Sequence, residues 1–236
     1  LSRMQGLTNL TFKGEKLEEV GELAFTEDSG LKSVELPNSV LKMGYHAFYK
    51  CISLSSVNYP VSWTECTESS DYPHPKGQIF EGCTKLNRIT IPEGVTTIPD
   101  YALKKADKLR YVTFPSTLET IGKETFKDCI GLPYIDFPYE LKTIGESAFE
   151  GCAGLINLEI PGSLSTVGKR AFYNNGNLDT VQIQEGVQIV SDEAFANNKE
   201  LTEVYLPDSL TQIGKNVFAN CPNIVIYCHN NTVASR

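Results

Sequence analysis

The chain has 236 residues, 41% of them hydrophobic, and a formal net charge of −8 at pH 7. An acidic surface disfavours nucleic acid and anionic membranes as partners, because both repel negative charge. No apolar run reaches the length of about 18 residues that indicates a transmembrane helix. No signal peptide is visible, and Leu1 indicates a mature or trimmed start.

The dominant feature is a repeat that follows an irregular first unit around residues 7–12. A phenylalanine recurs mostly every 23 residues. Such a period is typical of a solenoid, in which each unit packs only against its neighbours. We therefore expect one domain over residues 1–236, built from about nine repeats. The recurring residues are Phe25, Phe48, Phe80, Leu103, Phe126, Phe149, Phe172, Phe195 and Phe218.

The first half of each unit predicts a short strand. In one unit Leu158 and Ile160 alternate with the polar residues Asn157 and Glu159, and Pro161 follows. Alternation with a period of two indicates a strand with one buried face, and proline ends it because it lacks an N–H group.

The second half predicts a short helix or helical turn. Ile121, Thr125 and Cys129 have the i, i+4, i+8 spacing of one helix face. Glycine stands near the predicted helix start, at positions 122, 145, 168 and 214. Two residues after the phenylalanine, Gly, Asn or Asp predicts a left-handed cap. The cap residues are Gly82, Asp128, Gly151, Asn174, Asn197 and Asn220.

One unit carries an insertion near residues 62–78, because Phe48 and Phe80 are 32 residues apart. A loop that breaks a strict period is a candidate binding site, with Trp63 and Tyr72 as its aromatic residues. The alternative is that Trp63 packs into the core. Cys66, Asp71 and His74 lie nearby but lack a metal-ligand spacing, so we expect no metal site.

The cysteines follow the repeat. Five stand three residues after the recurring phenylalanine, where Asn175, Asn198 and Ala106 occupy other units. This position predicts buried free thiols, and an asparagine there must bond to the turning backbone. Neighbouring cysteines could also come within bridging distance. Cys66 and Cys228 fall outside this column and are the candidate reactive thiols. The five are Cys51, Cys83, Cys129, Cys152 and Cys221.

These features together resemble the BspA-like leucine-rich repeat family. The pattern L-x-x-V-x-L-P-x-S-V-x-x-I-G-x-x-A-F is clearest over residues 155–172, and the resemblance extends from about Leu7 to Tyr227. It implies an α/β fold: a right-handed leucine-rich-repeat solenoid with short parallel strands on one face and short helices or helical turns on the other. It also implies a bacterial cell-surface or secreted protein engaged in adhesion or host contact.

The strand face is the candidate binding surface, because exposed tyrosines beside arginine and carboxylates are typical interface anchors. We expect a monomeric, non-catalytic module, without a cofactor, that binds a protein partner, possibly a host extracellular protein. The alternative is a carbohydrate-binding module in which the tyrosines stack on sugars. Asp136 and Glu159 share a column, but an open face does not exclude water as glycoside chemistry needs. The candidate residues are Arg88, Tyr111, Tyr134, Asp136, Asn157, Glu159, Glu203 and Tyr205, with Trp63 and Tyr72 in the insertion.

Overall fold

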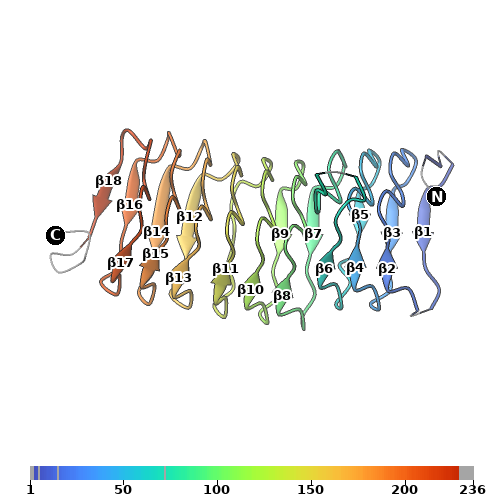
Figure 1. The fold of residues 1–236 in the computed structure, drawn as a ribbon, viewed down its shortest axis with the longest axis horizontal. Helices are drawn as coiled ribbons and strands as arrows, with labels where there is room; N and C mark the ends of the chain where they lie inside the picture. The colour runs from blue at the N-terminus through green and yellow to red at the C-terminus, as the bar shows by residue number, and fades with distance from the viewer. Residues whose placement is uncertain (1–2, 5, 15, 72, 229–236) are drawn as a thin grey trace.

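The fold is a single row of stacked coils that form an elongated rod (Figure 1). The computed structural model describes residues 3–4, 6–14, 16–71 and 73–228. The expected phenylalanine row is confirmed: the ring centroids of Phe126 and Phe149 lie 5.0 Å apart, and those of Phe149 and Phe172 lie 5.4 Å apart. One hydrophobic core cluster extends from Val20 to Cys221.

Each coil begins with a strand of a column that we call the front ladder. Its strands pair in parallel, as expected, with neighbouring coils in register, so that Leu158 lies beside Val181. They form three separate sheets, β1-β3-β5, β7-β9 and β12-β14-β16-β18. The strands are β1 (Asn9–Thr11), β3 (Ser33–Glu35), β5 (Ser56–Val57), β7 (Arg88–Thr90), β9 (Tyr111–Thr113), β12 (Asn157–Ile160), β14 (Thr180–Ile183), β16 (Glu203–Tyr205) and β18 (Val225–Tyr227).

A second column of two-residue strands, the side ladder, follows in each coil. It includes Ile121, which the sequence placed on a helix, and it forms the sheets β2-β4-β6 and β8-β10-β11-β13-β15-β17. The strands are β2 (Glu19–Val20), β4 (Lys42–Met43), β6 (Glu65–Cys66), β8 (Thr97–Ile98), β10 (Thr120–Ile121), β11 (Thr143–Ile144), β13 (Thr166–Val167), β15 (Ile189–Val190) and β17 (Gln212–Ile213).

The expected helices are wrong: the described residues contain no helix, and a turn segment stands in their place. Each turn segment has two residues with positive φ, which no helix interior accepts. The positive-φ residue that follows the recurring phenylalanine by two positions was expected as a left-handed cap. The positive-φ residue that precedes it by two positions was not expected. The unexpected residues are Leu23, His46, Gln78, Tyr101, Glu124, Ser147, Arg170, Glu193 and Asn216.

Hydrogen bonding explains this choice of turns over a helix. The N–H groups of Glu124, Phe126 and Asp128 donate to carbonyl oxygens of the next coil at 3.0, 2.8 and 2.8 Å. In alternation with them, the N–H groups of Lys127 and Cys129 donate to carbonyl oxygens three residues earlier in the same coil. In a helix every N–H group bonds along the axis of the same segment. The turns are favoured because their N–H groups also bond to the next coil and so join neighbouring coils.

The front ladder is interrupted at residues 134–137, where a strand was expected. Arg110 N donates to Asn87 O in the preceding coil at 2.8 Å, but Pro133 occupies the equivalent donor position. Proline has no N–H to donate, and the coil does not join its neighbours as a strand. Tyr134 and Asp136 therefore lie on an unpaired extended segment.

The insertion breaks all the ladders at one level. No backbone hydrogen bond among the described residues joins β5 to β7, β6 to β8, or the turn segment of Phe80 to that of Leu103. Side chains bridge this level, as where Lys105 Nζ lies 3.6 Å from a Glu81 carboxylate oxygen. The rod is continuous in its core and discontinuous in its backbone hydrogen bonding.

The cysteine column is confirmed as buried free thiols. Each thiol donates to the phenylalanine-position carbonyl of the preceding coil, for example Cys152 Sγ to Phe126 O at 3.1 Å. Burial raises the pKa of these thiols, to about 12 for Cys51. They are structural groups that cap a backbone acceptor.

Candidate functional site

The insertion contributes less to a binding surface than the sequence indicated. Trp63 is only 2% exposed, packs against Tyr59 with ring centroids 5.0 Å apart, and donates its indole N–H to Glu65 O. The prediction of Trp63 as a binding residue is therefore wrong, and the alternative, that Trp63 packs into the core, is confirmed. Tyr72 lies outside the described residues.

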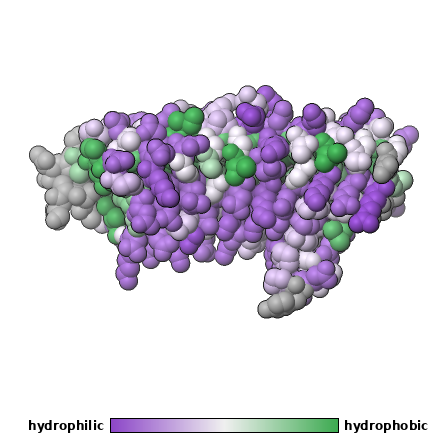
Figure 2. Space-filling view, turned by 90° about the horizontal axis from the view of Figure 1, so that it is seen from above, coloured by the Kyte–Doolittle hydropathy of each residue, from purple (hydrophilic) through white to green (hydrophobic). Residues whose placement is uncertain are grey.

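The inserted loop follows β6 in the sequence, between the side ladder and the next turn segment. It therefore lies beside these two parts of the coil and away from the front ladder. It projects from one side of the rod (Figure 2). A Glu22 carboxylate anchors it by accepting hydrogen bonds from Ser69 Oγ and Ser70 N, and these bonds lower the pKa of Glu22. The two candidate surfaces of the sequence, insertion and strand face, are thus separate.

Cys66 is not a reactive thiol, contrary to the sequence prediction. It is 5% exposed, and burial raises its pKa well above the usual range. Among the described residues, no group of three or more His, Cys, Asp or Glu side chains could hold a metal ion. Cys228 is half-buried.

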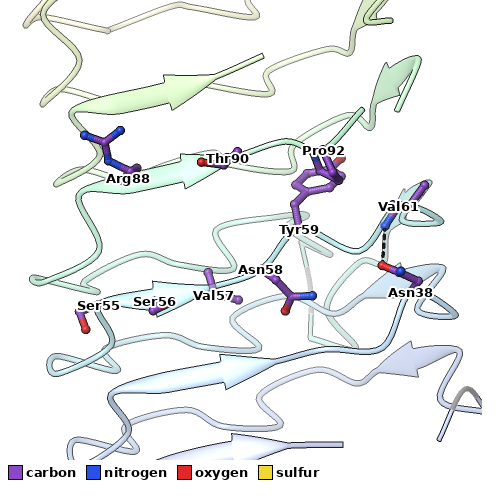
Figure 3. Close-up of a pocket in the computed structure, with 10 residues that line it drawn as sticks. All are labelled: Asn38, Ser55, Ser56, Val57, Asn58, Tyr59, Val61, Arg88, Thr90 and Pro92. Carbon is purple, nitrogen blue, oxygen red and sulfur yellow. Dashed lines mark hydrogen bonds between the residues drawn. The ribbon is translucent and has the colours of Figure 1, made fainter. Parts of the chain in front are cut away.

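A groove of about 460 Å³ opens where β5 and β7 fail to pair (Figure 3). Arg88 and Thr90 line one side, and Ser56 and Asn58 line the other. Asn58 bonds through its side chain to Leu36 N at 2.7 Å and to Leu36 O at 2.8 Å, so its amide replaces a strand partner. The groove is open and shallow with a mixed polar and apolar lining, and Arg88 is the only charged residue among the described residues that line it.

Arg88 also lies at one end of the row Arg88–Tyr111–Tyr134 that the sequence predicted. Its guanidinium carbon lies 4.8 Å from the centre of the Tyr111 ring, close enough for a cation–π interaction. The Tyr111 and Tyr134 rings meet edge to face with centroids 6.4 Å apart. Tyr134 is 56% exposed, so this row presents aromatic surface to solvent.

Asp136 and Glu159 line one hollow of about 390 Å³, next to this row. Gln184 Nε2 donates to a Glu159 carboxylate oxygen at 2.7 Å. Asn157 lies on the same strand as Glu159 and is exposed. The hollow is open to solvent, so the two carboxylates suit hydrogen bonding or charge recognition better than acid–base chemistry.

A second aromatic pair lies near the C-terminal end of the front ladder. The Tyr205 and Tyr227 rings stack with centroids 4.7 Å apart, and Tyr205 Oη donates to a half-buried Glu203 carboxylate at 3.0 Å. Sequence reasoning missed Tyr227. Tyr205 pairs with Tyr227, which is 22 residues later in the chain. The repeat length of 23 residues instead predicts that Cys228 lies beside Tyr205.

The structure thus places eight of the predicted residues on or beside the front ladder, in two groups. Arg88, Tyr111, Tyr134, Asp136, Asn157 and Glu159 form the central group, and Glu203 and Tyr205 form the other with Tyr227. Within the part of the chain that the structure describes, no helix has the length and apolarity needed to cross a bilayer.

Comparison with solved structures supports the same architecture. A leucine-rich repeat protein of T. pallidum, TpLRR, is 25% identical with a TM-score of 0.61, over 82% of this chain and 78% of that chain. The pneumococcal vaccine antigen PcpA shares the fold at 18% identity and a TM-score of 0.51, over 96% of this chain and 73% of that chain. A search of curated proteins finds no match.

The family model described as "BspA type Leucine rich repeat region" matches six copies, over residues 2–133 and 96–225. These ranges cover both ladders except the last two residues of β18, Ile226 and Tyr227. The chain belongs to the BspA-type leucine-rich repeat family.

Proposed function

We propose that this chain is a non-catalytic recognition module, exposed at the cell surface or secreted, that binds a protein partner through its front ladder. The observation that carries the proposal is the pair of exposed aromatic groups, Arg88–Tyr111–Tyr134 and Tyr205–Tyr227. Tyrosine and arginine are enriched among the residues that contribute most of the binding energy at protein interfaces. Family membership supports a role in protein interaction and a surface location.

The rigid backbone behind these side chains favours a preformed interface. β7 and β9 pair in register behind Arg88 and Tyr111, and β16 and β18 pair in register behind Tyr205 and Tyr227. A partner would not have to pay for ordering this surface, so more of the contact energy remains for affinity. A glycan partner would use the same tyrosines as stacking platforms, and experiment separates the two.

The test is a screen of the purified chain against one array of extracellular proteins and one array of glycans. We expect a protein ligand whose affinity falls at least about tenfold in Tyr111→Ala/Tyr134→Ala, since central anchors contribute about 2 kcal/mol or more. Tyr49→Ala, on a turn segment, is the matched control and should retain binding. Selective glycan binding, or protein binding that survives the double substitution, would contradict the proposal.

A further inference from the structure

The most exposed aromatic side chain of the described residues has no role so far. Tyr139 is 90% exposed and lies in the turn that follows the unpaired segment 134–137. Leu141 N donates to Pro138 O at 3.1 Å, which fixes this turn. The ring is thus held away from the core on an ordered turn, at the place where Pro133 opens the front ladder.

Tyr139 lines two hollows, one toward each neighbouring coil. The hollow toward the preceding coil has about 500 Å³ and includes Phe114. The hollow toward the following coil has about 390 Å³ and includes Pro161. Phe137 lines both, and its ring stacks on Phe114 with centroids 6.3 Å apart. Each hollow is large enough for a long side chain and has an apolar floor.

The rims of these hollows carry carboxylates. Asp136 lines both hollows, Glu93 and Glu140 line the first, and Glu159 lines the second. None of the four forms an ion pair within the described ranges, whereas Glu124 and Glu150 on the turn segments pair with lysine or arginine. Asp136 and Glu140 also have no hydrogen-bond partner among the described residues, so their negative charge is free for a ligand.

We propose that the two hollows beside Tyr139 receive arginine or lysine side chains of a basic polypeptide segment. This rests on the proposed function, because it assigns a chemical class to the partner segment that meets this part of the face. A cation gains from the aromatic ring by a cation–π interaction and from the carboxylates by charge, while its aliphatic stem covers the apolar floor. A neutral sugar would leave the carboxylates uncompensated.

The experiment measures binding of a fluorescein-labelled peptide of alternating arginine and glycine by anisotropy at about 0.05 M and 0.15 M salt. The full chain is compared with Tyr139→Ala, Tyr139→Phe and Asp136→Asn/Glu140→Gln. Tyr139→Ala should weaken binding about two- to fivefold, and Tyr139→Phe should retain it, because the ring face is kept. The charge variant should weaken binding more at low salt than at high salt.

The matched charge control is Glu19→Gln/Glu200→Gln, which removes two exposed carboxylates elsewhere on the rod. It should bind the peptide as the unmodified chain does. Equal loss in this control, absence of binding to the unmodified chain, or equal binding of a glutamate–glycine peptide would overturn the proposal. Binding of a neutral oligosaccharide that depends on Tyr139 would overturn it as well. A thermal melt of each variant verifies folding.

The two proposals fail in different ways. If Tyr111→Ala/Tyr134→Ala leaves a protein ligand bound while Tyr139→Ala weakens the arginine peptide, the front-ladder function is wrong and the basic-segment site stands. If the front-ladder variant loses its ligand while Tyr139→Ala leaves the peptide unaffected, the basic-segment site is wrong and the function stands.

Discussion

Two buried asparagines occupy the same place in consecutive coils, yet their side chains are bonded differently. Asn198 donates to Phe172 O at 3.1 Å and to Phe195 O at 2.8 Å, and it accepts from Asn175 N at 2.6 Å. Both polar side-chain atoms of Asn175 have no partner. The sequence prediction that an asparagine here bonds to the turning backbone therefore holds for Asn198 and is wrong for Asn175.

This difference predicts opposite effects of substitution. Asn198→Ala should lower the free energy of unfolding by about 2–3 kcal/mol, because it leaves buried backbone groups unsatisfied. Asn175→Cys should change it by less than about 1 kcal/mol, because a thiol fills this position in five other coils. Urea unfolding measures both. Equal destabilisation by the two substitutions would contradict this assignment.

Thiol accessibility gives a second prediction at this scale. In the folded chain at pH 8, iodoacetamide should modify Cys228, which is only half-buried, and leave the six buried thiols unmodified, because a thiol must reach solvent to react. In urea all seven should react. Mass spectrometry of peptides reads the result. Modification of Cys66 before unfolding would restore the original sequence prediction for that residue.

At the scale of the element, the repeat predicted the strands of the front ladder well and the side ladder and turn segments poorly. Apolar residues alternate along Asn157–Ile160, so the buried face of a front strand is visible in the sequence. The turn segments show i, i+4 spacing because Thr125 and Cys129 both face the core, and a helix and a chain of turns satisfy this pattern equally. Only the next coil, which accepts the N–H bonds, decides between them.

From the sequence, the recurring glycines indicated the start of a helix. The structure gives a different reason for glycine at these positions. A Cβ on Gly145 would lie 2.7 Å from backbone atoms of Gly122 and Lys123 in the preceding coil. Neighbouring coils thus touch backbone to backbone at Gly145, and the absence of a Cβ permits this close approach. Ser191 and Pro99 replace it in two coils.

Gly145→Ala should therefore lower the free energy of unfolding by about 1–3 kcal/mol through steric overlap. Gly176→Ala is the matched control: no atom lies within 4 Å of its added Cβ, and its φ is not positive. It should change stability by less than about 1 kcal/mol. Urea unfolding of the two variants checks the prediction, and an unaffected Gly145→Ala would show that the coils can separate at no cost.

At the scale of the whole molecule, the sequence indicated which face is exposed but not where that face opens. The columns of polar strand residues placed Arg88, Tyr111 and Tyr134 together. The groove at β5 and β7 and the hollows beside Tyr139 depend on missing backbone bonds between coils, and a single-chain pattern does not show these. Pro133 was the available signal, since a proline before a strand removes a donor.

Each coil contacts mainly its neighbours, so side-chain networks that cross coils help to hold the rod together. On the turn segments Glu150 lies between two cations of adjacent coils, 3.1 Å from Lys127 Nζ and 3.2 Å from an Arg170 guanidinium nitrogen. Burial opposes ionisation of Glu150, but hydrogen bonds from Ser147, Arg170 and Lys127 outweigh it and lower the pKa.

A lowered carboxylate pKa contributes stability that is present above the ordinary glutamate value of about 4.3 and is lost as the pH falls through the lowered pKa. Glu150→Gln should therefore lower the free energy of unfolding at pH 7 by about 1 kcal/mol, and the difference from the unmodified chain should shrink toward zero near pH 3. Glu146→Gln, which removes an exposed pair with Lys123, is the control and should cost less than about 0.5 kcal/mol at pH 7. Urea unfolding midpoints at both pH values test this prediction. If Glu150→Gln lowers the free energy of unfolding as much at pH 3 as at pH 7, then packing, and not charge, holds Glu150 between the coils.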